Sequence, residues 1–379
     1  MTTDAKSKAG LEDVVATSSS ICFIDGDRGI LAYRGYDIHD LAPNATFEEV
    51  CFLLWHGRLP NRAELGELQS QFAAAHPLPE GVVRLMRQLP PSDAMDTLRT
   101  LASALAHYDR DVADHSQPAN YRKAVRLTAQ MGSLVAAIGR VEQNQSPIDP
   151  DPVLGFAANF LFMLTGKRPD QLAVRAFDCA LILHADHELN ASTFAARVAA
   201  ATLTDIHSAI VAGICALKGP LHGGANAEVM KMLLGFGPDT SPEKVEAVIR
   251  EKLARKEKIP GFGHRVYRTM DPRAGHLRQM SLDLGKRSGQ PHWVEMSQRI
   301  EAVVKAEKKL NPNVDFYSAS MYYALGIPVA LYTPIFAVSR TSGWTAHVLE
   351  QFANNRLIRP RADYTGPPVP QAWVPLEQR

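Results

Sequence analysis

The sequence predicts a mainly α-helical protein of at least two domains with one small β-hairpin near its N-terminus. Three observations support this prediction: repeated helix start and stop signals, a single strand pair, and a composition typical of globular proteins. In 379 residues, 46% are apolar and 21% are charged, which excludes wholesale disorder and fibrous classes. At about 100 to 200 residues per domain, this length corresponds to two or three domains.

The hairpin is expected between Ile21 and Tyr33, where the segments ICFI and ILAY flank the turn sequence DGDRG. Both segments are rich in β-branched and aromatic residues, which favour strands. No other segment carries an equally strong strand signal, so we expect little sheet elsewhere.

Helix signals dominate the rest of the chain. Thr46 and Glu49 form a capping-box pattern ahead of an apolar run, and Gly57 is placed to end that helix. Asn61 and Glu64 repeat the start pattern. Similar start signals occur at Ser92, Asp170, Ser241 and Asp315. Together these patterns predict about fifteen helices.

Charge and targeting signals exclude several classes. The chain has 41 basic and 40 acidic residues, a formal charge of +1, which argues against a protein that coats nucleic acid. No apolar run is long enough to span a membrane, and the N-terminus lacks the apolar core of a secretory signal. The cysteines, which are Cys22, Cys51, Cys179 and Cys215, form no CxxC pair. We therefore expect a cytoplasmic protein without a disulfide framework or a zinc knuckle.

Several common motifs are absent. In GFGHRV, residues 261–266, Val266 stands where a dinucleotide fingerprint has its third glycine, and the segment follows Ile259 and Pro260 rather than a strand. Neither Gly-Lys pair is followed by Ser or Thr, so there is no P-loop, and HExxH and GxSxG do not occur. What remains is a set of His, Arg and Asp residues in glycine-rich contexts.

The first of these segments is GPLHGGANAEVMKMLLGFG, residues 219–237, in which His222 precedes a predicted helix. The partial positive charge of a helix N-terminus disfavours imidazolium, so a neutral His222 could donate a hydrogen bond to an oxygen. Taken alone, the segment fits a histidine packed at a glycine-rich turn better than a catalytic one.

The second segment is EKIPGFGHRVYRTMDPRAGHL, residues 257–277. Glycines on its N-terminal side let the backbone near His264 approach a ligand, and Arg265, Arg268 and Arg273 follow. Residues 251–273 hold seven basic and three acidic residues. This excess indicates an anionic ligand, although the lysines at 252–258 alone fit a solvated helix face.

A carboxylate and two histidines are further candidates. Asp315 in NPNVDFYSAS stands at a helix start, where it can be an N-cap or a general base. His184 and His187 lie three apart in HADHELNAS with Asp186 between them, which suggests a metal site but supplies no distant third ligand.

Two later arginines, Arg340 and Arg359, could each bind a carboxylate through bidentate hydrogen bonds or serve as ordinary surface ion-pair partners. The segment from Arg359 to the C-terminus holds five prolines, which exclude a long helix. We expect an extended arm that lies on another surface, such as that of a second subunit.

Taken together, the segments GPLHGGAN, PGFGHRVYRTMDPR, NPNVDFYS, HADHELNAS and the SR…RPRADY ending closely resemble the citrate synthase family. The N-terminal segment FIDGDRGILAYRGYDI resembles it as well. The likeness runs from about residue 10 to residue 364, with the motifs in the family's order. Each motif is modest alone, but their joint order is highly specific.

The resemblance implies a nearly all-α homodimer with two domains: residues 1–223 and 327–379 form the large domain, and residues 224–326 form a small domain that closes over the substrates. It implies that His222, His264 and Asp315 are catalytic. The residues implied for oxaloacetate or citrate are His187, His264, Arg273, Arg340 and, across the dimer interface, Arg359. Those implied for coenzyme A are Gly261, Phe262, Gly263 and Arg268, followed by Lys256 and Lys309.

The family's reaction needs no metal or permanently bound cofactor, and acetyl-CoA is a co-substrate. An aspartate with an ordinary pKa near ~3.9 would deprotonate the thioester methyl only if His222 stabilises the enolate as it forms. The chain has no long N-terminal extension of the kind found in NADH-inhibited relatives, so we expect no NADH control.

Three alternatives remain open at this point. The first is 2-methylcitrate synthase, which uses propionyl-CoA, because one methylene in an apolar pocket is worth only ~1–3 kcal/mol. The second is a non-catalytic helical scaffold whose arginine-rich groove binds acidic partners. The third is a metallohydrolase that uses His184, Asp186 and His187.

Overall fold

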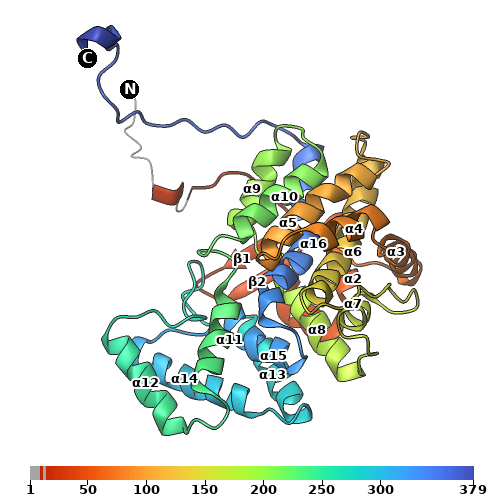
Figure 1. Ribbon diagram of the computed structural model, residues 1–379, viewed down its shortest axis with the longest axis vertical. Coiled ribbons are helices and arrows are strands. Elements are labelled where there is room, and N and C mark those ends of the chain that lie inside the picture. The colour runs from red at the N-terminus through yellow and green to blue at the C-terminus, as the bar shows by residue number, and fades with distance from the viewer. Residues whose placement is uncertain (1–8, 12–13) are drawn as a thin grey trace.

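The chain folds mainly into helices, as predicted. The computed structural model describes residues 9–11 and 14–379, and in these residues there are sixteen α-helices (Figure 1). Their bounds are α1 Ile38–Asn44, α2 Phe47–His56, α3 Arg62–Ala75, α4 Glu80–Gln88, α5 Ala94–Ala104, α6 Gln117–Val141, α7 Phe156–Thr165, α8 Gln171–His184, α9 Ala191–Ala200, α10 Ile206–Leu217, α11 Ala225–Phe236, α12 Pro242–Ala254, α13 Ala274–Arg287, α14 His292–Lys308, α15 Val314–Ala324 and α16 Tyr332–Ala353. Short 3₁₀ turns are η1 Ala9–Leu11, η2 Leu105–Tyr108, η3 Val329–Leu331 and η4 Leu376–Gln378.

The predicted hairpin is confirmed. Strands β1 Cys22–Asp25 and β2 Ile30–Tyr33 pair antiparallel, and a short third strand, β3 Tyr36–Asp37, adds to the other side of β2. The turn between β1 and β2 ends at Gly29, whose φ of 67° is in the left-handed region that favours glycine. The third strand was not expected, because two residues are too few to give a strand pattern.

The predicted helix starts are confirmed at most positions. The Thr46 hydroxyl accepts the N–H of Glu49 at 3.3 Å, and the Glu49 carboxylate accepts the N–H of Thr46 at 2.7 Å. Asn61 caps α3 in the same way. Gly57 ends α2 with a φ of 76°.

Two start predictions are wrong by one or two residues. Asp93, not Ser92, caps α5 by accepting the N–H of Met95. Asn313, not Asp315, caps α15, because its side-chain oxygen accepts the N–H of Asp315 at 3.0 Å. Asp315 is therefore the second residue of the helix, and its carboxylate is not engaged in capping.

The helices gather in two lobes (Figure 1). In one lobe, α16 packs against α2, α6, α8, α9 and α10, and most of its residues are buried. In the other, α11 and α13 pack on α15, and α12 packs on α14. The lobes meet where α8 contacts α13 and α15 and where α16 contacts α11. Closure of residues 224–326 as a domain stays a prediction.

The C-terminal segment leaves the body as an extended arm, as its prolines predicted (Figure 1). Its large side chains are exposed: Tyr364 is 64% and Trp373 is 77% accessible. The surface on which this arm lies stays a prediction. No helix in the described part of the chain is both long and apolar enough to cross a bilayer.

Candidate active site

His222 lies in the loop between α10 and α11, two residues before Gly224, the N-cap residue of α11, as predicted. Its Nε2 accepts the backbone N–H of Ser192 at 3.3 Å and lies 2.8 Å from the Ser192 hydroxyl. Because Nε2 accepts a backbone N–H, the ring proton is on Nδ1. Burial, together with Arg340, lowers the pKa of His222 to about 4. The imidazole is therefore neutral at neutral pH and has a free Nδ1–H to donate.

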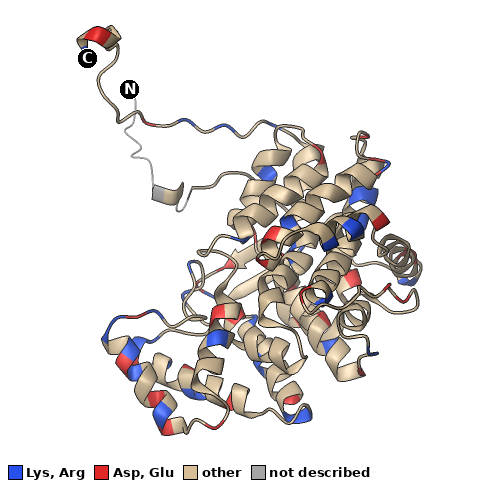
Figure 2. Cartoon of the chain, in the orientation of Figure 1, with Lys and Arg blue, Asp and Glu red and all other residues tan. Residues whose placement is uncertain are grey.

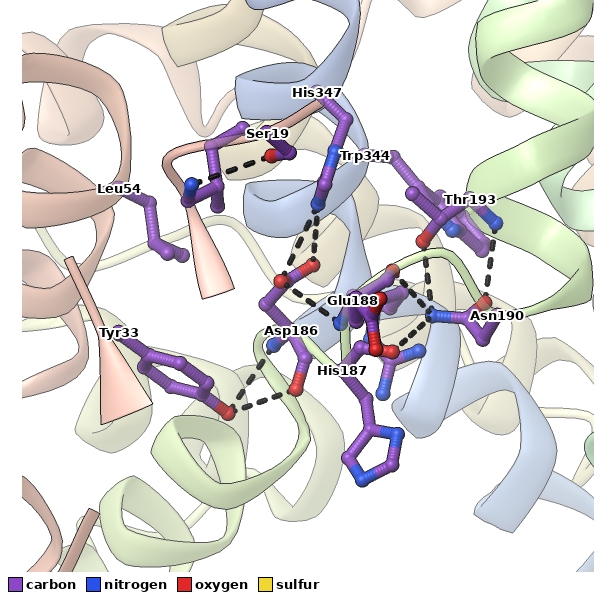
Figure 3. Close-up of polar contacts among 12 residues, drawn as sticks. Ser19, Tyr33, Leu54, Asp186, His187, Glu188, Asn190, Thr193, Trp344 and His347 are labelled. Atoms are coloured by element: carbon purple, nitrogen blue, oxygen red, sulfur yellow. Dashed lines mark hydrogen bonds and ion pairs between the residues drawn. The ribbon is translucent and has the colours of Figure 1, made fainter. Parts of the chain in front are cut away.

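Ser192 is itself fixed by neighbours from two elements. Its hydroxyl accepts the indole N–H of Trp344 at 3.1 Å and lies 2.8 Å from the side-chain oxygen of Asn190. Asn190 caps α9 by accepting the N–H of Thr193, as Figure 3 shows. Helix α16 and the start of α9 thus determine the orientation of His222.

His264 follows the glycine-rich segment 261–263. Its Nδ1 accepts the backbone N–H groups of Val266 at 3.0 Å and Tyr267 at 3.2 Å. The proton is therefore on Nε2, the opposite assignment to that of His222. Burial and the charge of Arg273 lower the pKa of His264 to about 4. His264 is a neutral donor through Nε2.

His187 lies next to His264, with the two ring centres 5.1 Å apart. Its Nε2 is 3.1 Å from the hydroxyl of Tyr267. Burial and the charge of Arg273 lower the pKa of His187 well below its usual range. Three neutral imidazoles are therefore available, since charging any of them beside buried arginines costs free energy.

The segment that carries His187 is held by Asp186 (Figure 3). The Tyr33 hydroxyl donates to the Asp186 carbonyl at 2.9 Å, and the Nε2 of His347 lies 3.3 Å from the Asp186 carboxylate. The N–H of Glu188 donates to the same carboxylate. Contacts on both sides of Asp186 therefore fix the start of the loop.

These contacts do not form the metal site that His184 and Asp186 suggested. The Nδ1 of His184 is 2.7 Å from the carbonyl of Ala180, inside its own helix, and Asp186 faces His347. Within residues 9–11 and 14–379, no group of three or more His, Cys, Asp or Glu side chains is arranged to hold a metal ion.

Asp315 is half-buried on the first turn of α15. Burial raises its pKa to about 6; Arg273 and Arg340 oppose this shift, and Asp271 adds to it. The expectation of an ordinary pKa near ~3.9 is therefore wrong, because the sequence does not show how far the carboxylate is removed from water. A carboxylate with this pKa is a stronger base, still ionised at neutral pH.

Two buried guanidinium groups lie close enough to shift these pKa values. Arg273 is 2% exposed and donates from Nε at 2.9 Å and from Nη2 at 2.8 Å to Asp271. Arg340 is 1% exposed, donates from Nε to the carbonyl of His184 at 2.7 Å, and lies 4.8 Å from the ring centre of Phe336. Both keep further N–H donors, which suit a bidentate carboxylate ligand.

A groove of about 1330 Å³ opens beside His264. Four residues that the resemblance implies for coenzyme A line it, namely Gly261, Phe262, Gly263 and Lys256; their contact with coenzyme A stays a prediction. Further basic lining residues are Lys218, Lys231, Lys258, Arg265 and Lys308. Figure 2 marks basic residues on α12 and the loop that follows it, with acidic residues among them on the helix. Asp93, Glu228 and Glu257 also line the groove, so its apolar wall is bordered by a rim on which basic residues outnumber acidic ones six to three.

Three predicted residues stand apart from this groove and the histidine cluster. Arg268 is exposed and pairs with Asp27 of the hairpin turn at 3.2 Å. Lys309 ends α14 in a left-handed conformation, with a φ of 56°. Arg359 is exposed on the C-terminal arm. In the described part of the chain none of the three lines the groove, and their contacts with a ligand stay predictions.

Sequence reasoning missed four residues of this site: Ser192, Tyr267, Asp271 and Trp344. The first three lie inside the motif segments, so proximity along the chain could have indicated them. Trp344 is one helical turn after Arg340 on α16, a spacing that places both on one face.

The fold and the site define a helical enzyme that binds an anionic substrate and a larger co-substrate, and comparisons with known proteins agree. A family model described as citrate synthase, C-terminal domain, matches residues 10–361. "Citrate synthase 2" of Bacillus subtilis is 55% identical over 98% of both chains. "Citrate/2-methylcitrate synthase" of the same organism is 44% identical over 94% of this chain and 96% of its own.

A solved structure gives the same result. The ternary complex of carboxymethyl coenzyme A and oxaloacetate with citrate synthase from Thermoplasma acidophilum superimposes with a TM-score of 0.91 at 34% identity. The match covers 98% of this chain and 99% of that chain. The chain belongs to the citrate synthase family.

Proposed function

We propose that this protein is a citrate synthase, which condenses acetyl-CoA with oxaloacetate and hydrolyses the citryl-CoA formed to citrate and coenzyme A. The proposal rests on the combination of His222 and His264, which are neutral and each have a free N–H, with the carboxylate of Asp315, whose pKa is raised to about 6. Proton abstraction beside a carbonyl needs such a base and such donors.

Asp315 is the base that takes a proton from the thioester methyl group. This carbon acid is very weak, so the negative charge that develops on the thioester oxygen must be stabilised at the same time. The Nδ1–H of His222 supplies that hydrogen bond. Because His222 is neutral, it stabilises the enolate without first transferring a proton.

Oxaloacetate is held by Arg273, Arg340 and His187, together with Arg359 of the partner subunit. The arginines offset the dicarboxylate charge and fix its orientation. The Nε2–H of His264 points to the ketone oxygen and polarises it, so that the enolate carbon attacks the carbonyl carbon and His264 stabilises the resulting alkoxide.

Coenzyme A occupies the groove beside His264. Its phosphates meet the basic residues of this rim, and the pantetheine arm follows the backbone of residues 261–263. Gly261 cannot be replaced without displacement, because a Cβ there would lie 2.8 Å from the side chains of Phe316 and Val229. This glycine keeps the groove wall close to α15.

After condensation, water attacks the thioester carbonyl of citryl-CoA, the C–S bond breaks and coenzyme A leaves as the thiol. Water must be kept out before this step, because otherwise acetyl-CoA would be hydrolysed. Closure of residues 224–326 over the large domain provides this exclusion, and oxaloacetate binds first.

We further propose that the active form is a homodimer. The support is the extended C-terminal arm, which carries Arg359 and exposed apolar residues such as Trp373 away from the body of its own chain. The four cysteines are free thiols, which agrees with a cytoplasmic location. The reaction uses no metal and no permanently bound cofactor.

Release of the coenzyme A thiol tests the function directly. Purified protein is mixed with acetyl-CoA and oxaloacetate, with each substrate alone as a control, and the thiol is detected with a chromogenic disulfide. Thiol release that requires both substrates and yields citrate supports the proposal. No release would favour the non-catalytic scaffold, and release without oxaloacetate would indicate a simple thioesterase.

A second candidate is 2-methylcitrate synthase, favoured by the likeness to the Bacillus citrate/2-methylcitrate synthase. The ratio of kcat/KM for acetyl-CoA and propionyl-CoA, measured at saturating oxaloacetate, separates the two. We expect acetyl-CoA to have the higher value, and a higher value for propionyl-CoA would assign the second activity.

A further inference from the structure

Asp271 is a buried carboxylate to which the mechanism above gives no role. It is 2% exposed and lies in the loop between His264 and α13. One of its oxygens accepts the backbone N–H of Arg273 at 3.1 Å and the Nε of the same residue at 2.9 Å. The other accepts Nη2 of Arg273 at 2.8 Å and the backbone N–H of Val314 at 3.1 Å.

The contact with Val314 links two distant parts of the chain. Val314 is the first residue of α15, and its N–H is one of those that a helix leaves unpaired at its N-terminus. The Asp271 carboxylate accepts this N–H, and the helix dipole favours a negative charge at the N-terminus of a helix. Asp315 is the next residue, so one carboxylate contacts both Arg273 and the turn that carries the base.

We propose that Asp271 is a positioning residue that holds Arg273 and the first turn of α15 in one geometry, so that dicarboxylate binding and proton abstraction depend on the same buried carboxylate. This inference rests on the proposed function and deepens it. The backbone supports the same unit: the N–H of Gly263 donates to Asn311 at 3.1 Å, and that of Asn313 donates to Gly261 at 2.9 Å.

The geometry determines which edge of Arg273 is available. A guanidinium has five N–H donors, and Asp271 accepts from Nε and Nη2. The edge formed by Nη1 and the second hydrogen of Nη2 therefore remains for the substrate. Without Asp271 the side chain would lose the two contacts that fix this orientation, and a buried cation would lose its partner.

The charge of Asp271 acts on Asp315 as well. Two buried guanidinium groups favour the ionised form of Asp315, whereas Asp271 opposes it and helps to keep its pKa raised. Removing the charge of Asp271 leaves burial as the main influence that raises the pKa of Asp315 against the two arginines, so this pKa falls. A residue that serves only to stabilise the fold would not produce this change.

The test is Asp271→Asn, which conserves shape and removes the charge, with Asp239→Asn at an exposed position of the same lobe as the control. We expect KM for oxaloacetate to rise roughly tenfold or more, and the acid limb of the pH profile of kcat/KM to shift to lower pH. The control should match the wild type in both. An unchanged acid limb with KM within about twofold of the wild type would overturn the proposal.

A second variant separates geometry from charge. Asp271→Glu keeps the charge but displaces the carboxylate by about one C–C bond, so KM for oxaloacetate should rise while the acid limb stays near that of the wild type. If Asp271→Asn does not fold, Asp271→Glu still tests the proposal. If both variants lose activity only in proportion to the fraction of protein that is unfolded, the proposal is overturned. If the wild-type protein forms no citrate, the proposed function is refuted. In that case titration calorimetry of the wild type and the variants with oxaloacetate still tests the role of Asp271 in binding.

Discussion

The Nε2 of His222 lies 2.8 Å from the hydroxyl of Ser192 and accepts the backbone N–H of the same residue. This contact joins the loop before α11 to the start of α9, thirty residues earlier in the chain. It leaves the Nδ1–H of His222 as the free donor. The catalytic role proposed for His222 therefore depends on a serine on a different helix.

We predict that His222→Ala lowers kcat by about 10²–10³, the usual cost of removing a donor to a developing oxyanion. Ser192→Ala should cost less, because the backbone N–H of residue 192 still fixes the ring. Steady-state kinetics of both variants, with unchanged oxaloacetate binding as the control, check this order. A Ser192→Ala variant slower than His222→Ala would contradict it.

Asp315→Asn should lower kcat by ~10²-fold or more, since the amide cannot accept the proton. Oxaloacetate binding should stay nearly intact because the arginines are unaffected. Turnover and calorimetric binding are measured on the same preparation, with Asp239→Asn as the exposed control. A near-normal kcat would remove Asp315 as the base.

The pH profile follows from the raised pKa of Asp315. The base works only when ionised, so kcat/KM should fall on the acidic side of about pH 6, near the pKa of the carboxylate. His222 and His264, whose pKa values are lowered to about 4, charge only at still lower pH. The measurement is kcat/KM between about pH 4.5 and 8.5. A kcat/KM that does not fall between about pH 7 and pH 5 would show that burial does not act as described.

Arg273→Ala should mainly raise the apparent KM for oxaloacetate, because a two-point contact with a carboxylate is lost. Some loss of stability is also expected, since the buried Asp271 would lose its partner. Arg299→Ala, which alters an exposed arginine of α14, is the matched control. An unchanged affinity for oxaloacetate would exclude Arg273 from the binding set.

Asp178 provides a prediction about stability. It lies buried on α8, where burial and the neighbouring Glu48 raise its pKa. For a carboxyl group with a raised pKa, the folded state binds the proton more tightly, so its contribution to stability is present at low pH and is lost as pH rises through the folded-state pKa. Asp178→Asn removes this dependence.

The melting temperature of Asp178→Asn relative to the wild type should therefore increase between about pH 5 and pH 8. Asp239→Asn should show no such trend. The side-chain oxygen of residue 178 still accepts the N–H of Phe47 in the variant, so the start of α2 keeps its partner. A difference that is constant with pH would contradict the assigned cause.

Local patterns predicted the elements whose signals are complete within a few residues. The capping boxes at Thr46 and Asn61 and the β1–β2 hairpin are confirmed because each needs only contacts within about one turn or one strand pair. The start of α15 was misplaced for the same reason: Asn313 and Asp315 both fit an N-cap by composition, and only the backbone geometry distinguishes them.

The sequence by itself determined that this chain is helical, belongs with the citrate synthases, and carries histidines, arginines and an aspartate in the family's motifs. Only the tertiary structure decided their protonation and direction: which nitrogen of His222 and of His264 bears the proton, and that Asp315 is a stronger base than a free carboxylate. Desolvation and hydrogen-bond partners set these properties, and both come from segments that meet only after the chain has folded.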